Sequence, residues 1–211
     1  MAFFLPKVYP LTDIGLTGLS HAEQVRRLAA GGASIVQLRD KASSSQDLYD
    51  QARLSLKTAR ELGVLLIIND RVDIALAIGA DGVHLGQEDL SPNVVRKLMG
   101  SKAIIGYSTH NIAQALEARS LPLDYLAIGP IFSTTTKADT APVLGLKGLH
   151  TVRQALDCPI PLVAIGGITT QNALDVIEAG ADSVAMIGAL LSKPEEITQR
   201  TSALLDTLRS M

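Results

Sequence analysis

Short apolar segments alternate with longer amphipathic segments along the whole chain, and this alternation limits the fold more than any other feature. Eight apolar segments, each followed by a helix-like pattern, occupy residues 8–12, 34–38, 65–68, 82–85, 103–107, 125–128, 161–165 and 183–187. Nearly unbroken apolar runs of this length indicate strands that are buried on both faces, as in a parallel sheet. Eight β-then-α units in order predict a closed barrel or a doubly wound sheet.

A repeated phrase favours the barrel. Variants of Gly-Ala-Asp-X-Val occur at residues 32–36, 79–83 and 180–184, with a looser copy at 123–126, so the phrase falls at every second strand. This recurrence suits a barrel whose interior is filled by layers of side chains from alternate strands. Asp81, Asp124 and Asp182 stand at strand starts, where we expect a structural role. The prediction is an α/β protein, one (β/α)8 TIM-barrel domain spanning residues 1–211.

Composition narrows the class of function. Apolar residues make up 47% of the chain and the formal net charge is −2, without a long basic stripe. This balance disfavours disorder and argues against nucleic acid or an anionic membrane as partner. Cys158 is the only cysteine, so neither an internal disulfide nor a cysteine-based zinc site is expected. With no signal peptide or membrane-spanning stretch recognised, we expect a soluble, cytoplasmic protein that acts on small molecules, and leave open whether it forms a homo-oligomer.

Glycines and polar residues follow the predicted strands, at the end where such barrels carry their active sites. Gly166–Gly167 and Ile187–Gly188 come after the last two strands. Glycine lets backbone N–H groups approach an anion, so a phosphate site is predicted there. The alternative is that these glycines serve tight packing in a βα turn.

Charged side chains predict two further subsites at the same end. Asp70 and Asp89 follow the third and fourth strands, and two carboxylates without cysteine suit Mg²⁺ that is held largely by oxygen and substrate phosphate. Arg39, Lys41 and Lys137 could grip a diphosphate and stabilise it as a leaving group. Solvated loop charges remain the alternative for both groups.

The histidines carry less information. His84 lies inside a strand segment, where a buried hydrogen-bonded role and a ligand contact are both open. His21 and His150 are expected on helix surfaces, and His110 is expected to begin a helix and orient a loop. No Ser/His/Asp order or histidine-rich metal spacing stands out.

Seven segments, in order, resemble the thiamine-phosphate synthase family over nearly the whole chain. They are residues 9–13 (YPLTD), 37–41 (QLRDK), 68–73 (INDRVD), 82–90 (GVHLGQEDL), 106–110 (GYSTH), 129–137 (GPIFSTTTK) and 163–168 (VAIGGI). The family joins 4-amino-2-methyl-5-hydroxymethylpyrimidine diphosphate to 4-methyl-5-(2-phosphooxyethyl)thiazole, with Mg²⁺ as cofactor, and releases thiamine phosphate and diphosphate. The resemblance therefore implies a metal-binding transferase of thiamine biosynthesis.

The resemblance also implies residue roles. The residues matched to pyrimidine diphosphate binding are Gln37, Leu38, Arg39, Asp40, Lys41, Asn69, Ser108 and Lys137. Those matched to thiazole phosphate binding are Thr134, Thr135, Thr136, Gly167, Ile187 and Gly188. Asp70 and Asp89 would hold Mg²⁺, and the catalytic set would be Arg39, Lys41, Ser108 and Lys137. The family's mechanism is dissociative: diphosphate leaves first, and the thiazole nitrogen, which carries no proton, captures the cation without a general base.

Two departures from the family and three alternatives remain. Many relatives have proline at the position of Ser133 and serine near Gly188; neither change removes a backbone N–H, but a hydroxyl contact at Gly188 is lost. A thiazole tautomerase of the same superfamily would use a histidine within 129–131, where this chain has Pro130. A regulatory barrel that only binds thiazole phosphate would show affinity without turnover. A sugar-phosphate isomerase would need a proton-transferring pair that the sequence does not offer.

Overall fold

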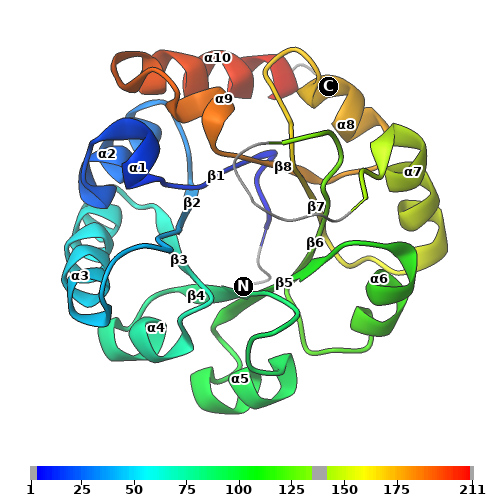
Figure 1. Ribbon diagram of the computed structural model, residues 1–211, viewed down its shortest axis with the longest axis horizontal. Helices are drawn as coiled ribbons and strands as arrows, with labels where there is room; N and C mark the ends of the chain where they lie inside the picture. Colours follow the sequence, from blue (N-terminus) through cyan, green and yellow to red (C-terminus); the bar gives the residue numbers. More distant parts are fainter. Residues whose placement is uncertain (1–3, 135–141, 210–211) are drawn as a thin grey trace.

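The computed structural model describes residues 4–134 and 142–209 and shows a (β/α)8 barrel (Figure 1). Eight parallel strands form one sheet in the order β1-β8-β7-β6-β5-β4-β3-β2. Their bounds are β1 Val8–Pro10, β2 Ile35–Leu38, β3 Leu65–Asn69, β4 Gly82–Leu85, β5 Ile104–Thr109, β6 Tyr125–Ile128, β7 Leu162–Ile165 and β8 Ser183–Met186. Just past β1, the Thr12 N–H donates to the Gln37 oxygen at 2.9 Å, which closes the ring between β1 and β2. The predicted fold class is therefore confirmed.

Helices surround the strands, as Figure 1 shows. Their bounds are α1 Ile14–Thr17, α2 His21–Ala30, α3 Ser45–Glu61, α4 Val72–Ile78, α5 Pro92–Met99, α6 Ile112–Ala118, α7 Gly145–Leu156, α8 Ala173–Glu178, α9 Gly188–Leu191, the 3₁₀ helix η1 Pro194–Glu196 and α10 Ile197–Arg209. The one-turn helices α1 and α9 were not expected, because four residues show no helical period. Within the described part of the chain, no helix is long and apolar enough to span a membrane.

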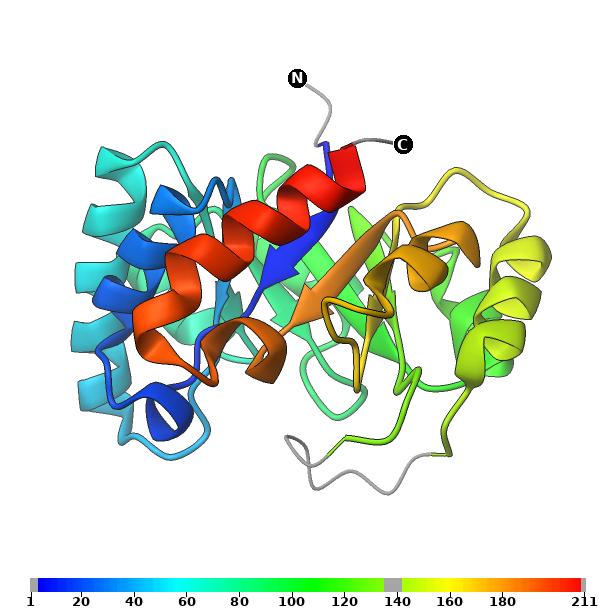
Figure 2. The same cartoon turned by 90° about the horizontal axis from the view of Figure 1, so that it is seen from above.

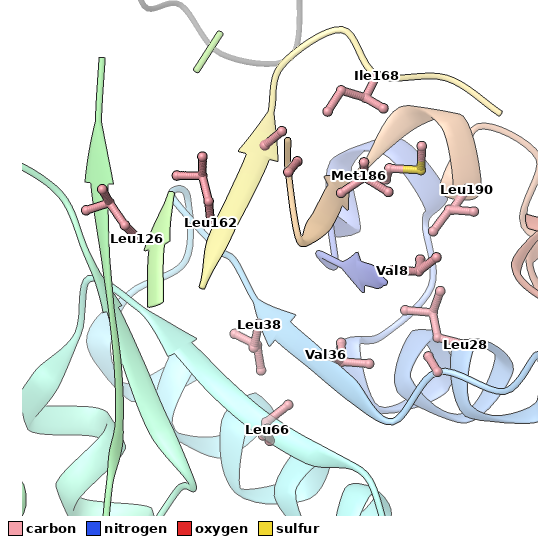
Figure 3. Packing of buried hydrophobic residues seen from close by; sticks show 14 of the residues in the cluster. Val8, Leu28, Val36, Leu38, Leu66, Leu126, Leu162, Ile168, Met186 and Leu190 are labelled. Atoms are coloured by element: carbon pink, nitrogen blue, oxygen red, sulfur yellow. The ribbon is translucent and has the colours of Figure 1, made fainter. Parts of the chain in front are cut away.

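Alternation along each strand divides the apolar residues into two cores. Alternate strand residues, among them Tyr9, Ile67 and Val163, fill the interior of the barrel. The residues between them pack outward against the helices; Figure 3 shows Val36 and Leu38 of β2 among this outer group. This two-residue period decides which side chains can face a ligand at the barrel mouth.

The three aspartates of the repeated phrase tie neighbouring strands together at the end where the strands begin. Each carboxylate accepts a 2.8 Å hydrogen bond from a backbone N–H near the start of the preceding strand: Asp81 from Leu66, Asp124 from Ile105 and Asp182 from Leu162. Asp124 also pairs with Arg96 at 2.6 Å. The structural role expected for these aspartates is confirmed. Strand β1 starts and helix α10 ends on this side, opposite the carboxyl ends of the strands (Figure 2).

Candidate active site

A cavity of about 1250 Å³ opens at the carboxyl ends of the strands. Side chains from all eight strands, or from the loops that follow them, line it. Barrels of this kind bind their ligands at this end, because the loops after the strands converge there while the barrel below stays packed.

The floor of the cavity is a chain of hydrogen-bonded polar side chains inside the barrel. The Tyr9 and Tyr125 hydroxyls lie 2.9 Å apart, and Gln37 Nε2 donates to Tyr9 at 3.2 Å. His84 Nδ1 lies 2.9 Å from the Tyr125 hydroxyl, and its Nε2 lies 2.8 Å from Ser108 Oγ. Burial raises the pKa of both tyrosines, so both hydroxyls keep their protons. His84 is thus buried and hydrogen-bonded, as one of its two expected roles required, and it also lines the cavity.

An acidic pair lies at one side of this cavity. Asp70 has φ +62°, a rare left-handed conformation for a residue with a side chain, and its N–H donates to the His84 oxygen at 2.8 Å. Asp89 accepts from the Gly86 N–H at 2.7 Å. Burial raises the pKa of Asp89, and the neighbouring charge of Asp70 raises it further. Two carboxylates that repel each other are stabilised by a nearby positive charge, and the Lys41 Nζ, 2.5 Å from Asp70, supplies one in this structure.

This donor set fits Mg²⁺ better than zinc. Among residues 4–134 and 142–209, no group of three or more His, Cys, Asp or Glu side chains is arranged to hold a metal by itself. A closed zinc site needs such a group, whereas Mg²⁺ commonly takes one or two carboxylates and completes its shell with water and substrate phosphate. Asp70 and Asp89 provide that partial, all-oxygen set.

Two cations lie beside the acidic pair. Lys41 has a side chain that is 58% exposed, so its ammonium can move to a ligand. Arg39 is more confined: Nη1 lies 3.8 Å from Asp13 Oδ2, and Nε is buried with no hydrogen-bond partner among the described residues. A buried guanidinium N–H without a partner is costly, and a ligand oxygen in the cavity would relieve that cost.

The glycines after β7 serve packing as well as access. Gly167 has φ +64°, and an added Cβ would lie 2.5 Å from the Ser133 oxygen, so a side chain is excluded on both grounds. Gly188 begins α9, and an added Cβ there would meet nothing within 4 Å. The packing explanation therefore accounts for Gly167 but not for Gly188, where open space faces the cavity.

Comparison of the amino-acid sequence with known proteins identifies a family. The sequence profile of the family described as thiamine monophosphate synthase matches residues 8–190. The chain belongs to this family. A thiamine-phosphate synthase of Chloroflexus aurantiacus is 46% identical over 187 residues, which cover 88% of this chain and 85% of that protein. One of Koribacter versatilis is 44% identical over 213 residues, covering 98% and 97%.

Solved structures agree. A thiamine phosphate pyrophosphorylase of Pyrococcus furiosus superposes with a TM-score of 0.86 at 36% identity, covering 97% of this chain and 96% of that one. The orotidine 5'-phosphate decarboxylase of Pyrococcus horikoshii, at 14% identity and a TM-score of 0.68, shares the fold alone. Several different enzymes share this barrel, so the fold alone does not identify the family. The family of this chain follows from the matching profile and from the relatives above 30% identity.

Most residues matched to the thiamine monophosphate synthase family meet at one cavity. Those that line it are Gln37, Arg39, Lys41, Asn69, Asp70, Asp89, Ser108, Thr134, Gly167, Ile187 and Gly188. Leu38 does not line it: the side chain is 1% exposed and packs outward, because it alternates with Gln37 before it and Arg39 after it in the extended chain at the end of β2. Asp40 does not line it either, since its carboxylate turns to loop donors. Thr135, Thr136 and Lys137 lie outside the described residues.

Two residues that line this cavity, and one contact within it, were not predicted from the sequence. Tyr9 and Tyr125 line the floor, and their place at interior positions of β1 and β6 could have revealed them. Gln87, which lies in the family segment 82–90 after the fourth strand, was expected at this end; what had no local signal is its contact, since Nε2 donates to the Ser108 oxygen at 2.5 Å. The surface placement of His21 was wrong: the residue is fully buried. His110 precedes α6 and its Nδ1 lies 2.8 Å from the Gly129 oxygen, as expected of a loop-orienting residue.

Proposed function

We propose that the chain condenses 4-amino-2-methyl-5-hydroxymethylpyrimidine diphosphate with 4-methyl-5-(2-phosphooxyethyl)thiazole, giving thiamine phosphate and diphosphate. One observation carries the proposal. In a chain of the thiamine monophosphate synthase family, an acidic pair, two cations and two glycine turns line the same cavity. Two phosphorylated substrates can therefore lie side by side within it, and bringing two reactants together in a fixed orientation removes much of the barrier to their reaction.

The pyrimidine diphosphate occupies the side formed by β2 to β5. Gln37, Asn69 and Ser108 bind the pyrimidine ring, whose polar edge needs donors and acceptors at fixed positions. Ser108 is oriented by His84, which is held in turn by Tyr125. Arg39 and Lys41, together with Lys137, hold the diphosphate. Leu38 and Asp40 support this segment from behind and make no direct contact in this proposal.

Asp70 and Asp89 would hold Mg²⁺, which supplies positive charge to the departing diphosphate. The left-handed backbone at Asp70 is the kind of strain that persists where the surrounding structure fixes a functional residue. Lys41 shares the Asp70 carboxylate in this structure and would turn to the diphosphate when the carboxylate binds the ion.

The thiazole phosphate occupies the side formed by β6 to β8. Gly167 and Gly188, with the backbone of Ile187, would present N–H groups to the phosphate, and the hydroxyls of Thr134 and its neighbours Thr135 and Thr136 would add donors. A glycine at position 188 can present its backbone N–H without a side chain in the way, so the absence of serine there removes only a hydroxyl contact.

The chemistry needs stabilised charge rather than proton transfer. As the carbon–oxygen bond of the pyrimidine diphosphate breaks, negative charge grows on the leaving oxygens, and Arg39 and Lys41 bind that charge most strongly in the transition state. The thiazole nitrogen then forms the new carbon–nitrogen bond and releases no proton. A tautomerase would instead need a proton-transferring side chain near position 130, and Pro130 has none.

The test is direct. Purified protein is mixed with both substrates and Mg²⁺, and thiamine phosphate is measured with and without a chelator. Asp70→Ala and Lys137→Ala should each lower turnover on the order of 100-fold, a typical loss when one charge-stabilising group is removed. Asp73→Ala and Lys102→Ala, which change charges outside the cavity, are the matched controls. Unchanged rates in both site variants would reject the assignment of the site, and affinity for thiazole phosphate without product would indicate a regulatory barrel. A cytoplasmic location stays a prediction, and whether the chain forms a homo-oligomer stays open.

A further inference from the structure

One buried histidine lies behind the cavity and is not used by the proposed chemistry. His21 is the first residue of α2, and its side chain is 0% exposed. Its Nδ1 lies 2.7 Å from Thr12 Oγ1, just past the end of β1, and its Nε2 lies 3.3 Å from Asp40 Oδ2, in the loop after β2. His21 does not line the cavity. A fully buried imidazole with partners on two different loops is therefore available for a role other than contact with substrate.

The partners of His21 determine which nitrogen carries the proton. Burial by itself raises the pKa of Asp40, but hydrogen bonds from Ser43, Ala42 and His21 outweigh it and lower this pKa from 3.8 to about 2, so the carboxylate is ionised and can only accept. The His21 Nε2 that faces it must then be the donor. Burial lowers the pKa of His21 against the attraction of Asp40, which leaves the ring neutral with an unprotonated Nδ1.

The other ring nitrogen of His21, Nδ1, is connected to the backbone of Arg39 through the Thr12 hydroxyl. Because Nδ1 of a neutral, Nε2-protonated ring accepts, the Thr12 hydroxyl donates to it. The same hydroxyl oxygen accepts from the Arg39 N–H at 3.3 Å. The Thr12 N–H donates to the Gln37 oxygen at 2.9 Å, so Thr12 contacts the β2 segment both before and at Arg39. Each donor in this series of hydrogen bonds therefore has one acceptor.

Asp40 completes the support on the other side of Arg39. Its carboxylate accepts from the Ala42 N–H and the Ser43 N–H at 2.9 Å each and from the Ser43 hydroxyl at 2.7 Å, besides His21. Four donors match the acceptor capacity of one carboxylate, so Asp40 has none to spare for substrate or metal. The tight turn that results fixes the backbone on both sides of Lys41.

We infer that His21 is a positioning residue for the diphosphate: through Thr12 and Asp40 it fixes the backbone of residues 39–41, from which Arg39 and Lys41 reach the ligand. This inference rests on the proposed function for the identity of the substrate. It does not rest on turnover, because any diphosphate anion bound by Arg39 and Lys41 would depend on the same support. Groups that orient a binding residue from behind typically change affinity or activity by about 10-fold to 100-fold when removed.

The experiment measures binding of inorganic diphosphate with Mg²⁺ by titration calorimetry. His21→Leu keeps a similar volume and removes both hydrogen bonds, so we expect the dissociation constant for diphosphate to rise about 10-fold or more. In the turnover assay, the KM for the pyrimidine diphosphate should rise while the KM for the thiazole phosphate stays unchanged. His21→Gln can still place an amide N–H near Asp40, and it should recover most of the affinity.

Two controls separate positioning from general destabilisation. Val152→Ala creates a cavity beneath α7, on the other side of the barrel, and should lower stability without changing diphosphate affinity. His150→Gln changes an exposed histidine and should change neither. If His21→Leu binds diphosphate as wild type does, or if both KM values rise equally, the inference is wrong. A failed turnover assay with intact diphosphate binding would reject the proposed reaction and leave the role of His21 standing.

A measurement on the unaltered protein tests the same inference when His21→Leu does not fold. The ¹⁵N chemical shifts of the His21 ring distinguish its two neutral tautomers and the charged form. We expect the neutral form with the proton on Nε2 at neutral pH. A proton on Nδ1, or a charged ring, would contradict the hydrogen-bond directions from which the role is derived.

Discussion

Replacing Gly106 with alanine should destabilise the barrel because this glycine makes room for Tyr125. Gly106 pairs with Tyr125 across β5 and β6, and an added Cβ would lie 2.0 Å from Cζ, 2.3 Å from the hydroxyl oxygen and 2.4 Å from Cε2 of the ring. Two aromatic neighbours restrict how far the ring can move. Tyr9 packs against it edge-on with centroids 5.6 Å apart, and His84 stacks on it at 5.5 Å.

The cost follows from the shift that alanine would force. Cβ contacts shorter than 3.0 Å are essentially never seen, so the 2.0 Å approach requires the ring to move by at least about 1 Å. A movement of that size disrupts the two hydrogen bonds in which the Tyr125 hydroxyl takes part, one with Tyr9 and one with His84, each worth about 1 kcal/mol. Overpacking adds about 1–3 kcal/mol. The free energy of unfolding should therefore fall by about 3–5 kcal/mol.

Urea denaturation of four proteins measures this effect: wild type, Gly106→Ala, Tyr125→Leu and the double variant. Tyr125→Leu removes every ring atom that the new Cβ would meet, so adding Gly106→Ala in that background should cost less than about 1 kcal/mol. Gly15→Ala, where the nearest contact is an ordinary 3.4 Å, is the control and should stay within about 0.5 kcal/mol of wild type. An equal penalty for Gly106→Ala in both backgrounds would refute the steric argument.

Three further predictions address other contacts. Asp124→Ala should lower the free energy of unfolding by about 2–4 kcal/mol in urea, because two donors lose their acceptor, while KM values stay unchanged. Tyr9→Phe should lower the free energy of unfolding by about 1–3 kcal/mol. It should also raise the KM for the pyrimidine diphosphate, since Gln37 loses its fixed acceptor; an unchanged KM would show that the hydrogen bonds of the cavity floor do not affect substrate binding. Asp40 has its pKa lowered to about 2, so its contribution to the free energy of unfolding is present above about pH 4 and is lost as pH falls toward 2. Asp40→Asn should therefore make stability depend less on pH between about 4 and 2, as measured by circular dichroism.

The fold could be predicted from sequence because its determinants are local and repeated. Each apolar segment predicts one strand, and the repeated Gly-Ala-Asp phrase places three equivalent aspartates, whose clamping role the structure confirms. The rim residues followed from the rule that active sites lie after the strands. Assigning every residue of the family motif QLRDK to ligand binding was wrong for Leu38, because strand alternation directs this side chain to the outer core.

Partners distant in sequence could not be predicted. Tyr9 and Tyr125 are 116 residues apart, and nothing near either residue indicates that their hydroxyls meet inside the barrel. His21 looked like a surface residue because it opens an amphipathic helix. Its hydrogen-bond partners in the interior, Thr12 and Asp40, come from the segments that follow β1 and β2. Buried polar side chains take their roles from such partners, since a buried polar group without a partner costs more than a hydrogen bond gains.

The number of hydrogen bonds that each aspartate already accepts separates the carboxylates that hold the backbone from those that lie at the cavity. A carboxylate can accept about four hydrogen bonds. Asp40 accepts four, and Asp124 accepts from a backbone N–H and an arginine, so both are committed to holding the chain. Asp70 and Asp89 each accept one from the described donors and repel one another. Acidic residues with unused acceptor capacity and a like-charged neighbour gain most from a bound cation. We therefore propose this pair as the Mg²⁺ site on that physical asymmetry, rather than on position after a strand.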